Sequence, residues 1–317
     1  MQMTIICSLL HLLVDGLCVC CLYMVASAFS SSHLVGIFLS YNILAFLTQP
    51  LTGIMADRIE RKHWLLLASV LLLTMACLAT SVVVNLRLSA HGVMIVAILL
   101  GIGNSLFHVW GGKQVAVKSG NDIRALGTFV STGAFGLSLG IVFFSWPLIY
   151  VFLISICLLS IVYLNLYFRS TNATTTDKMS VHRFSRLFVS LSLLALMLAV
   201  MLRSNLGETF TGGIPKSACL ILLIGFLSML GKMAGGWLVR YMGIARMLVF
   251  VVSLSVGCFI FRSQGLSVLL LGLFAVNCTM PLTLYLANLV LPRHEGLAFG
   301  LLASALIPGY LLAIYSL

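Results

Sequence analysis

The chain has 317 residues, of which 61% are hydrophobic and only 8% are charged, and its mean hydropathy is +1.16. A composition this apolar excludes a soluble domain and indicates an integral membrane protein. The formal net charge of +11 is carried mainly between the apolar runs, so membrane topology explains it and no nucleic-acid partner is expected. Nine cysteines lie mostly within these runs, which predicts free thiols. We expect no metal site and no cofactor, because Cys18 and Cys20 point to different helix faces.

Taken in chain order, the apolar runs are each long enough, at about 20 residues, to cross about 30 Å of hydrocarbon. The first run contains His11 and Asp15 and lacks a basic leader and a cleavage site, so it is expected to be a retained span. The sequence therefore predicts an all-α polytopic membrane protein. Its eleven predicted spans cover residues 3–29, 34–56, 64–86, 92–118, 124–145, 147–168, 186–206, 216–239, 244–262, 266–291 and 296–317.

A sustained polar stretch divides six predicted spans from five. We expect an N-terminal six-helix lobe over 1–168, a linker over 169–185 and a C-terminal lobe of five helices over 186–317. If the spans alternate in direction, Arg87, Lys216 and Arg262 lie on one side of the membrane, and twelve basic residues lie on the linker side. This bias places the linker and the N-terminus in the cytoplasm. The twelve are Arg58, Arg61, Lys62, Lys118, Arg124, Arg169, Lys178, Arg183, Arg186, Arg240, Arg246 and Arg293.

A dense cluster of charge separates the second and third runs, in the order Gly53-Ile54-Met55-Ala56-Asp57-Arg58-Ile59-Glu60-Arg61-Lys62. This order resembles the loop between helices 2 and 3 of the major facilitator superfamily of transporters. The resemblance implies two pseudo-symmetric helical lobes that rock around a central site, with gating roles for Gly53, Asp57, Arg58 and Arg61. We expect the Asp57 carboxylate to lie at the N-terminus of the last run, near Gly296, and to hold the cytoplasmic side closed.

The second half of the chain contains a weaker copy of this pattern. Gly53 to Arg58 aligns with Gly236 to Tyr241, 183 residues later, as expected for parallel repeats. Arg240 stands where the first copy has Asp57, so the second gate, assigned to Gly236 and Arg240, has no acid at that position. The superfamily normally has a twelfth span, which is expected either beyond Leu317 or to be missing from this protein.

Other segments resemble the fosmidomycin-resistance branch of the superfamily. They are Val14-Asp15 in the first run, Gly101 to His108 in the fourth, and Phe299-Gly300-Leu301 in the last. After the Phe-His pair this chain has Val109-Trp110 where that branch has Pro-Glu, which removes a titratable group. The resemblance implies a monomeric transporter of the bacterial inner membrane.

Ionisable side chains within spans cost about 2.5 kcal/mol or more at mid-membrane, so they mark candidate functional positions. His11 and Asp15 lie four residues apart on one helix face and are the predicted proton-coupling pair, with His108 as the third member. The alternative is a hydrogen-bonded pair that holds the first span against a neighbour. The remaining candidates are Lys113, Arg203, Lys232 and, near the end of a span, Glu208.

The basic residues within the spans outnumber the clearly buried acid, so the central cavity is expected to suit an anionic or zwitterionic solute. Arg203 is the predicted solute contact, whereas Lys113 and Lys232 are expected to extend to the cytoplasmic interface. Other polar side chains complete the predicted solute site, although hydrogen bonding between helices is the alternative for these amides. They are Asn42, Gln49, Asn104, Asn277 and Tyr285.

No phosphate-binding loop, Ser-His-Asp constellation or metalloprotease motif occurs, so the protein is not expected to be an enzyme. The sequence predicts a secondary active transporter that moves a small organic solute, with an anion favoured, by proton-coupled efflux of the antiporter type. The alternative is a membrane receptor or scaffold that kept the fold and lost transport. Three departures from the family pattern favour it: Arg240, the absence of the superfamily's arginine motif from the fourth span, and a twelfth span that is expected beyond Leu317 or to be missing.

Overall fold

The computed structural model describes residues 1–29, 34–59, 63–88, 90–170 and 185–316. Within these ranges the secondary structure is helical, and ten segments are long and apolar enough to cross a membrane. A shorter apolar helix, Ile244–Ile260, occupies the remaining predicted span, so each of the eleven predicted spans is helical. The predicted gate residue Arg61 and nearly all of the predicted linker lie outside the described residues.

The helices of the two halves follow one another in chain order. The first half contains α1 (Gln2–Ala28), α2 (Leu34–Asn42), the π-helical segment η2 (Ile43–Leu47), α3 (Gln49–Arg58), α4 (His63–Leu86), α5 (Ala90–Lys118), α6 (Ile123–Val142) and α7 (Trp146–Ser170). The second half contains α8 (Arg186–Gly212), α9 (Ala218–Met242), α10 (Ile244–Ile260), the 3-10 turn η3 (Arg262–Gln264), α11 (Leu266–Asn277), α12 (Met280–Val290), α13 (Glu295–Ser304) and α14 (Leu306–Ser316).

Three of the predicted spans are interrupted, and a proline follows each interruption. Pro50 follows the break between η2 and α3, Pro281 follows the break between α11 and α12, and Pro308 lies in the first turn of α14. Proline lacks the N–H that a helix interior needs and its ring clashes with the preceding turn, so it is tolerated only where a helix restarts.

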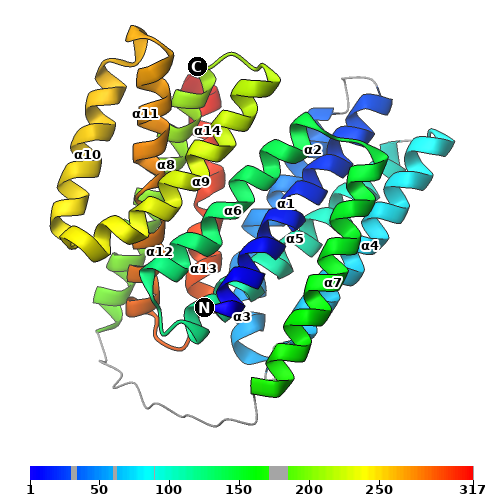
Figure 1. Ribbon diagram of the computed structural model, residues 1–317, viewed down its shortest axis with the longest axis horizontal. Coiled ribbons are helices and arrows are strands. Elements are labelled where there is room, and N and C mark those ends of the chain that lie inside the picture. Colours follow the sequence, from blue (N-terminus) through cyan, green and yellow to red (C-terminus); the bar gives the residue numbers. More distant parts are fainter. Residues whose placement is uncertain (30–33, 60–62, 89, 171–184, 317) are drawn as a thin grey trace.

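The two helical lobes meet along two pairs of helices (Figure 1). Helix α6 packs against both α1 and α9, and α3 packs against α13. Glycine permits the close approach of α6 to both neighbours, because a Cβ at Gly136 would meet the Leu12 carbonyl and one at Gly225 would meet the Ser138 side chain. The N-terminus, the end of α7 and the start of α8 lie at one end of the bundle, which we call the linker side, and the C-terminus lies at the other, the far side.

Helix α1 is the most enclosed of the spanning helices. In its most apolar stretch, 78% of the residues are buried inside the protein, compared with 11% for α8. Polar side chains on α1 therefore face other helices instead of lipid, and this places them where a polar site can form.

Candidate functional site

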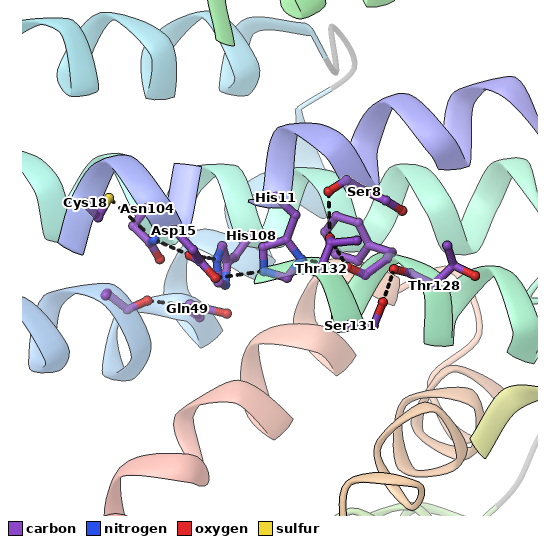
Figure 2. Close-up of polar contacts among 12 residues, drawn as sticks. Ser8, His11, Asp15, Cys18, Gln49, Asn104, His108, Thr128, Ser131 and Thr132 are labelled. Carbon is purple, nitrogen blue, oxygen red and sulfur yellow. Dashed lines mark hydrogen bonds and ion pairs between the residues drawn. The ribbon is translucent and has the colours of Figure 1, made fainter. Parts of the chain in front are cut away.

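The three residues predicted to couple protons lie together in one buried cluster, which Figure 2 shows. Asp15 on α1 is contacted from both sides: its Oδ2 lies 3.2 Å from His11 Nε2, and its Oδ1 lies 2.9 Å from His108 Nε2 on α5. The three residues are only 5–6% exposed. Tertiary packing thus places the His11–Asp15 pair in contact with a third titratable side chain, His108, which is 93 residues from Asp15 in the sequence.

The hydrogen bonds around the cluster assign the tautomer of His11. Its Nδ1 lies 2.7 Å from the Phe129 carbonyl oxygen, which can only accept, so Nδ1 carries a hydrogen. In the neutral ring Nε2 then has a lone pair directed at a carboxylate oxygen of Asp15. Two acceptor atoms at this distance require a proton or another cation between them. Asn104 supplies a further donor, because its Nδ2 lies 2.9 Å from Asp15 Oδ1.

Helix α6 leaves room for the cluster because it presents a glycine to it. A Cβ added at Gly133 would collide with the Asp15 carboxylate and the His11 ring. One turn earlier, the Phe129 ring stacks on the His11 ring with centroids 4.8 Å apart. The cluster is therefore held by α1, α5 and α6 together.

Two adjoining cavities of about 730 and 390 Å³ lie between the lobes. The larger is lined by Arg203, Lys232 and Asn277, and it reaches the far side, where Lys216 borders it. The smaller is lined by all three cluster residues. Both cavities include Lys232 and Glu208 in their walls. The acid–histidine cluster of one lobe and the basic residues of the other therefore face a shared space.

Arg203, which lines the larger cavity, is a buried cation with an unpaired guanidinium nitrogen among the described residues. It is 8% exposed, and its Nη1 atom has no hydrogen-bond partner among the described residues. A buried cation without a partner is unfavourable, so a site of this kind gains stability when an anionic group enters it. Lys232 on α9 lines the same cavities. The expectation that Lys232 extends to the interface is therefore wrong in this structure.

The other residues predicted to contact solute are dispersed. Asn42 lines the smaller cavity and Asn277 the larger, whereas Asn104 holds Asp15. Gln49 and Tyr285 line neither of these cavities within the described residues. Gln49 is fully buried, and its side-chain amide donates to the Ala45 carbonyl oxygen at 2.7 Å. The backbone carbonyl oxygen of Tyr285 accepts a hydrogen bond from the Asn121 side chain at 3.2 Å.

On the linker side, Asp57 makes the predicted contact with the last span. Asp57 Oδ1 accepts from the Gly296 N–H at 3.0 Å and Oδ2 accepts from the Leu297 N–H at 2.9 Å, at the N-terminus of α13. A Cβ at Gly53 would lie 2.5 Å from the Gly296 carbonyl oxygen, so glycine is needed for this approach. The contact is confirmed, and the gating role of Asp57 stays a prediction. Arg58 is exposed at the end of α3.

Sequence reasoning missed the cation that completes this contact. Lys113 Nζ donates to Asp57 Oδ1 at 2.8 Å and to the Ala56 carbonyl at 2.9 Å, and the residue is 6% exposed. The expectation that Lys113 extends to the interface is wrong, because its ammonium is buried in an ion pair. An acid at the end of one span and a lysine within another were the available signals, but their pairing depends on packing between α3 and α5.

The second copy of the gate motif lies against the N-terminus of α6. A Cβ at Gly236 would lie 2.7 Å from the Ile123 carbonyl oxygen, and Arg240 is exposed. Here the helix is capped by its own Asp122, which accepts from the Arg124 N–H at 2.9 Å and forms an ion pair with the Arg124 guanidinium at 2.7 Å. The hydrogen bond from Arg124 holds the pKa of Asp122 below its ordinary value. An Asp before an apolar run is an N-cap signal that sequence reasoning overlooked.

Comparison with known proteins identifies the family. Residues 4–313 match the sequence profile of the Major Facilitator Superfamily, whereas no curated protein sequence matches the chain. The E. coli fucose:proton symporter is similar in structure, with a TM-score of 0.67, 12% identity and coverage of 99% of this chain and 90% of the symporter. A bacterial homologue of the iron transporter ferroportin, in an outward-facing state, has a TM-score of 0.67 and 16% identity, with 100% and 91% covered.

The human organic anion transporter TETRAN is a third similar structure, with a TM-score of 0.67, 16% identity and coverage of 99% of this chain and 93% of the transporter. At such low identities these likenesses show the fold alone. The family match covers almost the whole chain, and the apolar helices are long enough to span a bilayer. The protein is therefore a multi-pass integral membrane protein that belongs to the Major Facilitator Superfamily of transporters.

Proposed function

We propose that this protein moves a small organic anion across the membrane by alternating access. The observation that carries the proposal is the buried Arg203 guanidinium, which lines the central cavity with Nη1 unpartnered among the described residues. A carboxylate, phosphonate or sulfonate group can accept two parallel hydrogen bonds from a guanidinium. Lys232 lines the same cavity and adds a second positive charge.

The arrangement of the helices supports a state that is open on one side. The larger cavity reaches the far side, while the Asp57 carboxylate joins α3 to α13 at the linker side. Positive residues favour the cytoplasmic side of membranes, and the linker side carries most of them. We therefore propose that the structure is outward-facing, and that rocking of the lobes breaks the Asp57 contact to admit solute from the cytoplasm.

We further propose that the His11–Asp15–His108 cluster carries the coupling proton and that transport is efflux by antiport. His11 Nε2 and Asp15 Oδ2 face one another at 3.2 Å and need a shared proton or other cation, which rocking can expose to either side in turn. The protein is proposed to act as a monomer in a bacterial inner membrane, with its N-terminus cytoplasmic.

Flux measurements in proteoliposomes test this proposal. We suggest a panel of carboxylates, phosphonates and uncharged analogues of matched size, with and without an imposed pH gradient. Arg203→Gln should reduce anion flux about tenfold or more, because removing a charged partner of a bound anion costs roughly 1.5–3 kcal/mol, and Arg203→Lys should restore part of it. Arg262→Gln, which changes an exposed arginine on the far side, is the matched control.

Asp15→Asn should abolish accumulation driven by the pH gradient and leave exchange at equal pH largely intact. Accumulation that persists in this variant would place coupling elsewhere, with Glu208 and His108 the next pair to test. Anion flux that is unchanged in Arg203→Gln would remove the proposed solute contact. If no solute has a flux that depends on this protein, the receptor or scaffold alternative gains support.

A further inference from the structure

The His11–Asp15–His108 cluster has the donor atoms and the geometry of a metal site. Each residue offers one ligand atom, and the three atoms all lie within 4.8 Å of one another. Two imidazole nitrogens and one carboxylate form a donor set found in zinc and iron(II) sites that keep an open coordination position. We propose that this cluster binds one divalent transition-metal ion of the first row, such as Zn²⁺.

The spacing of the donor atoms suits an ion of this size. Around a tetrahedral zinc ion with bonds of about 2.0–2.1 Å, neighbouring ligand atoms are roughly 3.3 Å apart. The two nitrogen–oxygen distances here are 3.2 Å for His11 and 2.9 Å for His108. These two contacts use different carboxylate oxygens of Asp15, and the three ligand atoms lie within 4.8 Å of one another. Binding therefore requires the side chains to rearrange around a common centre.

The surrounding residues hold two of the three donors in the orientation that a metal requires. The Phe129 carbonyl fixes the hydrogen of His11 on Nδ1, which leaves the Nε2 lone pair directed into the cluster. The Asn104 amide donates to Asp15 Oδ1 and restrains that carboxylate. Hydrogen bonds of this kind to ligating side chains are typical of metal sites. Gly133 keeps the space beside Asp15 and His11 free of a side chain.

The site is enclosed but accessible. The three residues are each less than one-tenth exposed, yet all of them line the 390 Å³ cavity. An ion can therefore enter from the cavity, and the open coordination position faces it. Lys232 and Glu208 are the charged residues that line the same cavity. The Lys232 charge opposes a divalent cation, so we expect an anion such as chloride to occupy the open position.

Metal binding by the purified full chain in lipid nanodiscs tests the proposal without any transported solute, so its outcome is independent of the proposed transport. Equilibrium dialysis should find one Zn²⁺ per chain, and Co²⁺ should give the visible absorption of a four- or five-coordinate site with nitrogen and oxygen ligands. Asp15→Asn and His108→Gln should each abolish this site. Asn104→Ala, which removes a positioning residue, should raise the dissociation constant by roughly 10–100-fold.

Two matched controls separate this site from others in the chain. His91→Gln changes an exposed histidine at the start of α5, and Cys219→Ser removes an exposed thiol. Neither change should alter the binding of Zn²⁺ or Co²⁺. Gel filtration and thermal unfolding would establish that each variant is folded. The parent protein also suffices for a test, because a thiolate-to-cobalt charge-transfer band would assign the ion to cysteine and overturn the proposal. Failure of the parent to bind either ion, or stoichiometric binding that persists in folded Asp15→Asn, would overturn it as well.

Discussion

On the linker side, the first copy of the repeated loop brings the N-terminus of α13 onto α3, and the second copy brings the N-terminus of α6 onto α9. Both pairs of helices come close at a glycine, Gly53 in one copy and Gly236 in the other. A Cβ added at either glycine would lie 2.5–2.7 Å from a backbone carbonyl oxygen of the opposing helix. The charges differ. In the first copy Asp57 caps a helix of the opposite lobe, whereas in the second Asp122 caps its own helix and Arg240 is exposed.

This difference indicates which contact resists opening. The side chains of Lys113 and Asp57 are 7% and 5% exposed, whereas those of Arg124 and Asp122 are 38% and 34% exposed. The Lys113–Asp57 ion pair joins α5 to α3 within the first lobe, so separation of the lobes must break only the two hydrogen bonds that Asp57 accepts from α13. Separation leaves the Asp122 cap intact because that cap also lies within one lobe. The close approach at a glycine therefore occurs in both copies, whereas a carboxylate that joins the two lobes is present only in the first copy.

The largest effect is expected from Asp57→Asn. This change leaves the Lys113 ammonium buried without its counter-charge and weakens two hydrogen bonds to α13. Only the hydrogen bonds to α13 join the two lobes, and a hydrogen bond to a charged acceptor contributes roughly 1.5–3 kcal/mol, so the closed linker side should lose most of its population. The measurement is the labelling rate of a single cysteine introduced on the linker side of the cavity.

Asp122→Asn is the matched control for this prediction, since an exposed ion pair contributes only about 0–1 kcal/mol. It should leave the labelling rate close to that of the parent. Equal inward and outward populations in Asp57→Asn and the parent would remove the gating role of Asp57.

A smaller effect, and a symmetric one, is expected from Gly53→Ala and Gly236→Ala. A methyl group at either position meets the backbone of the opposing helix, where flexible side chains cannot move aside. Overpacking of this kind costs roughly 1–3 kcal/mol, partly offset by the better helix propensity of alanine, about 1 kcal/mol. Both variants should open the linker side to a similar extent in the same labelling assay. An effect confined to Gly53→Ala would show that the second approach does not contribute to closure.

The sequence predicts the fold well because membrane spans follow from length and hydropathy. Each of the eleven apolar runs is helical, and the loop motif around Asp57 correctly indicated the superfamily. The breaks at η2 and within the last two spans were not predicted, although Pro50, Pro281 and Pro308 were visible as their signals.

The candidate site was predictable only where its members share a helix. His11 and Asp15 lie four residues apart on α1, and Asn104 and His108 repeat that spacing on α5. Their meeting depends on how α1 and α5 pack, which helical periodicity does not specify. The Lys113 partnership with Asp57 depends on tertiary packing in the same way, because the two residues are 56 positions apart.

A local effect is expected from Asp122→Ala, which removes the cap of α6. Loss of an N-cap side chain costs about 0.5–2 kcal/mol, and it should fray the first turn of α6 while the lobes stay closed. Hydrogen exchange of the backbone amides near Arg124 should become faster, with no change in cysteine labelling on the linker side. Increased labelling in this variant would mean that the second contact also holds the lobes together.

The smallest expected effect is that of pH on the N-terminal turn of α6, which Asp122 caps. The hydrogen bond from Arg124 lowers the pKa of Asp122 below its ordinary value of 3.8. A carboxylate whose pKa is lower in the folded state contributes stability that is fully present above its ordinary pKa and is lost as the pH falls through the lowered one. Protection of the first turn of α6, corrected for intrinsic exchange, should therefore stay constant between about pH 5 and 8. A step in protection within this range would show that another group titrates against the cap, and the comparison of the two gates would then have to include that group.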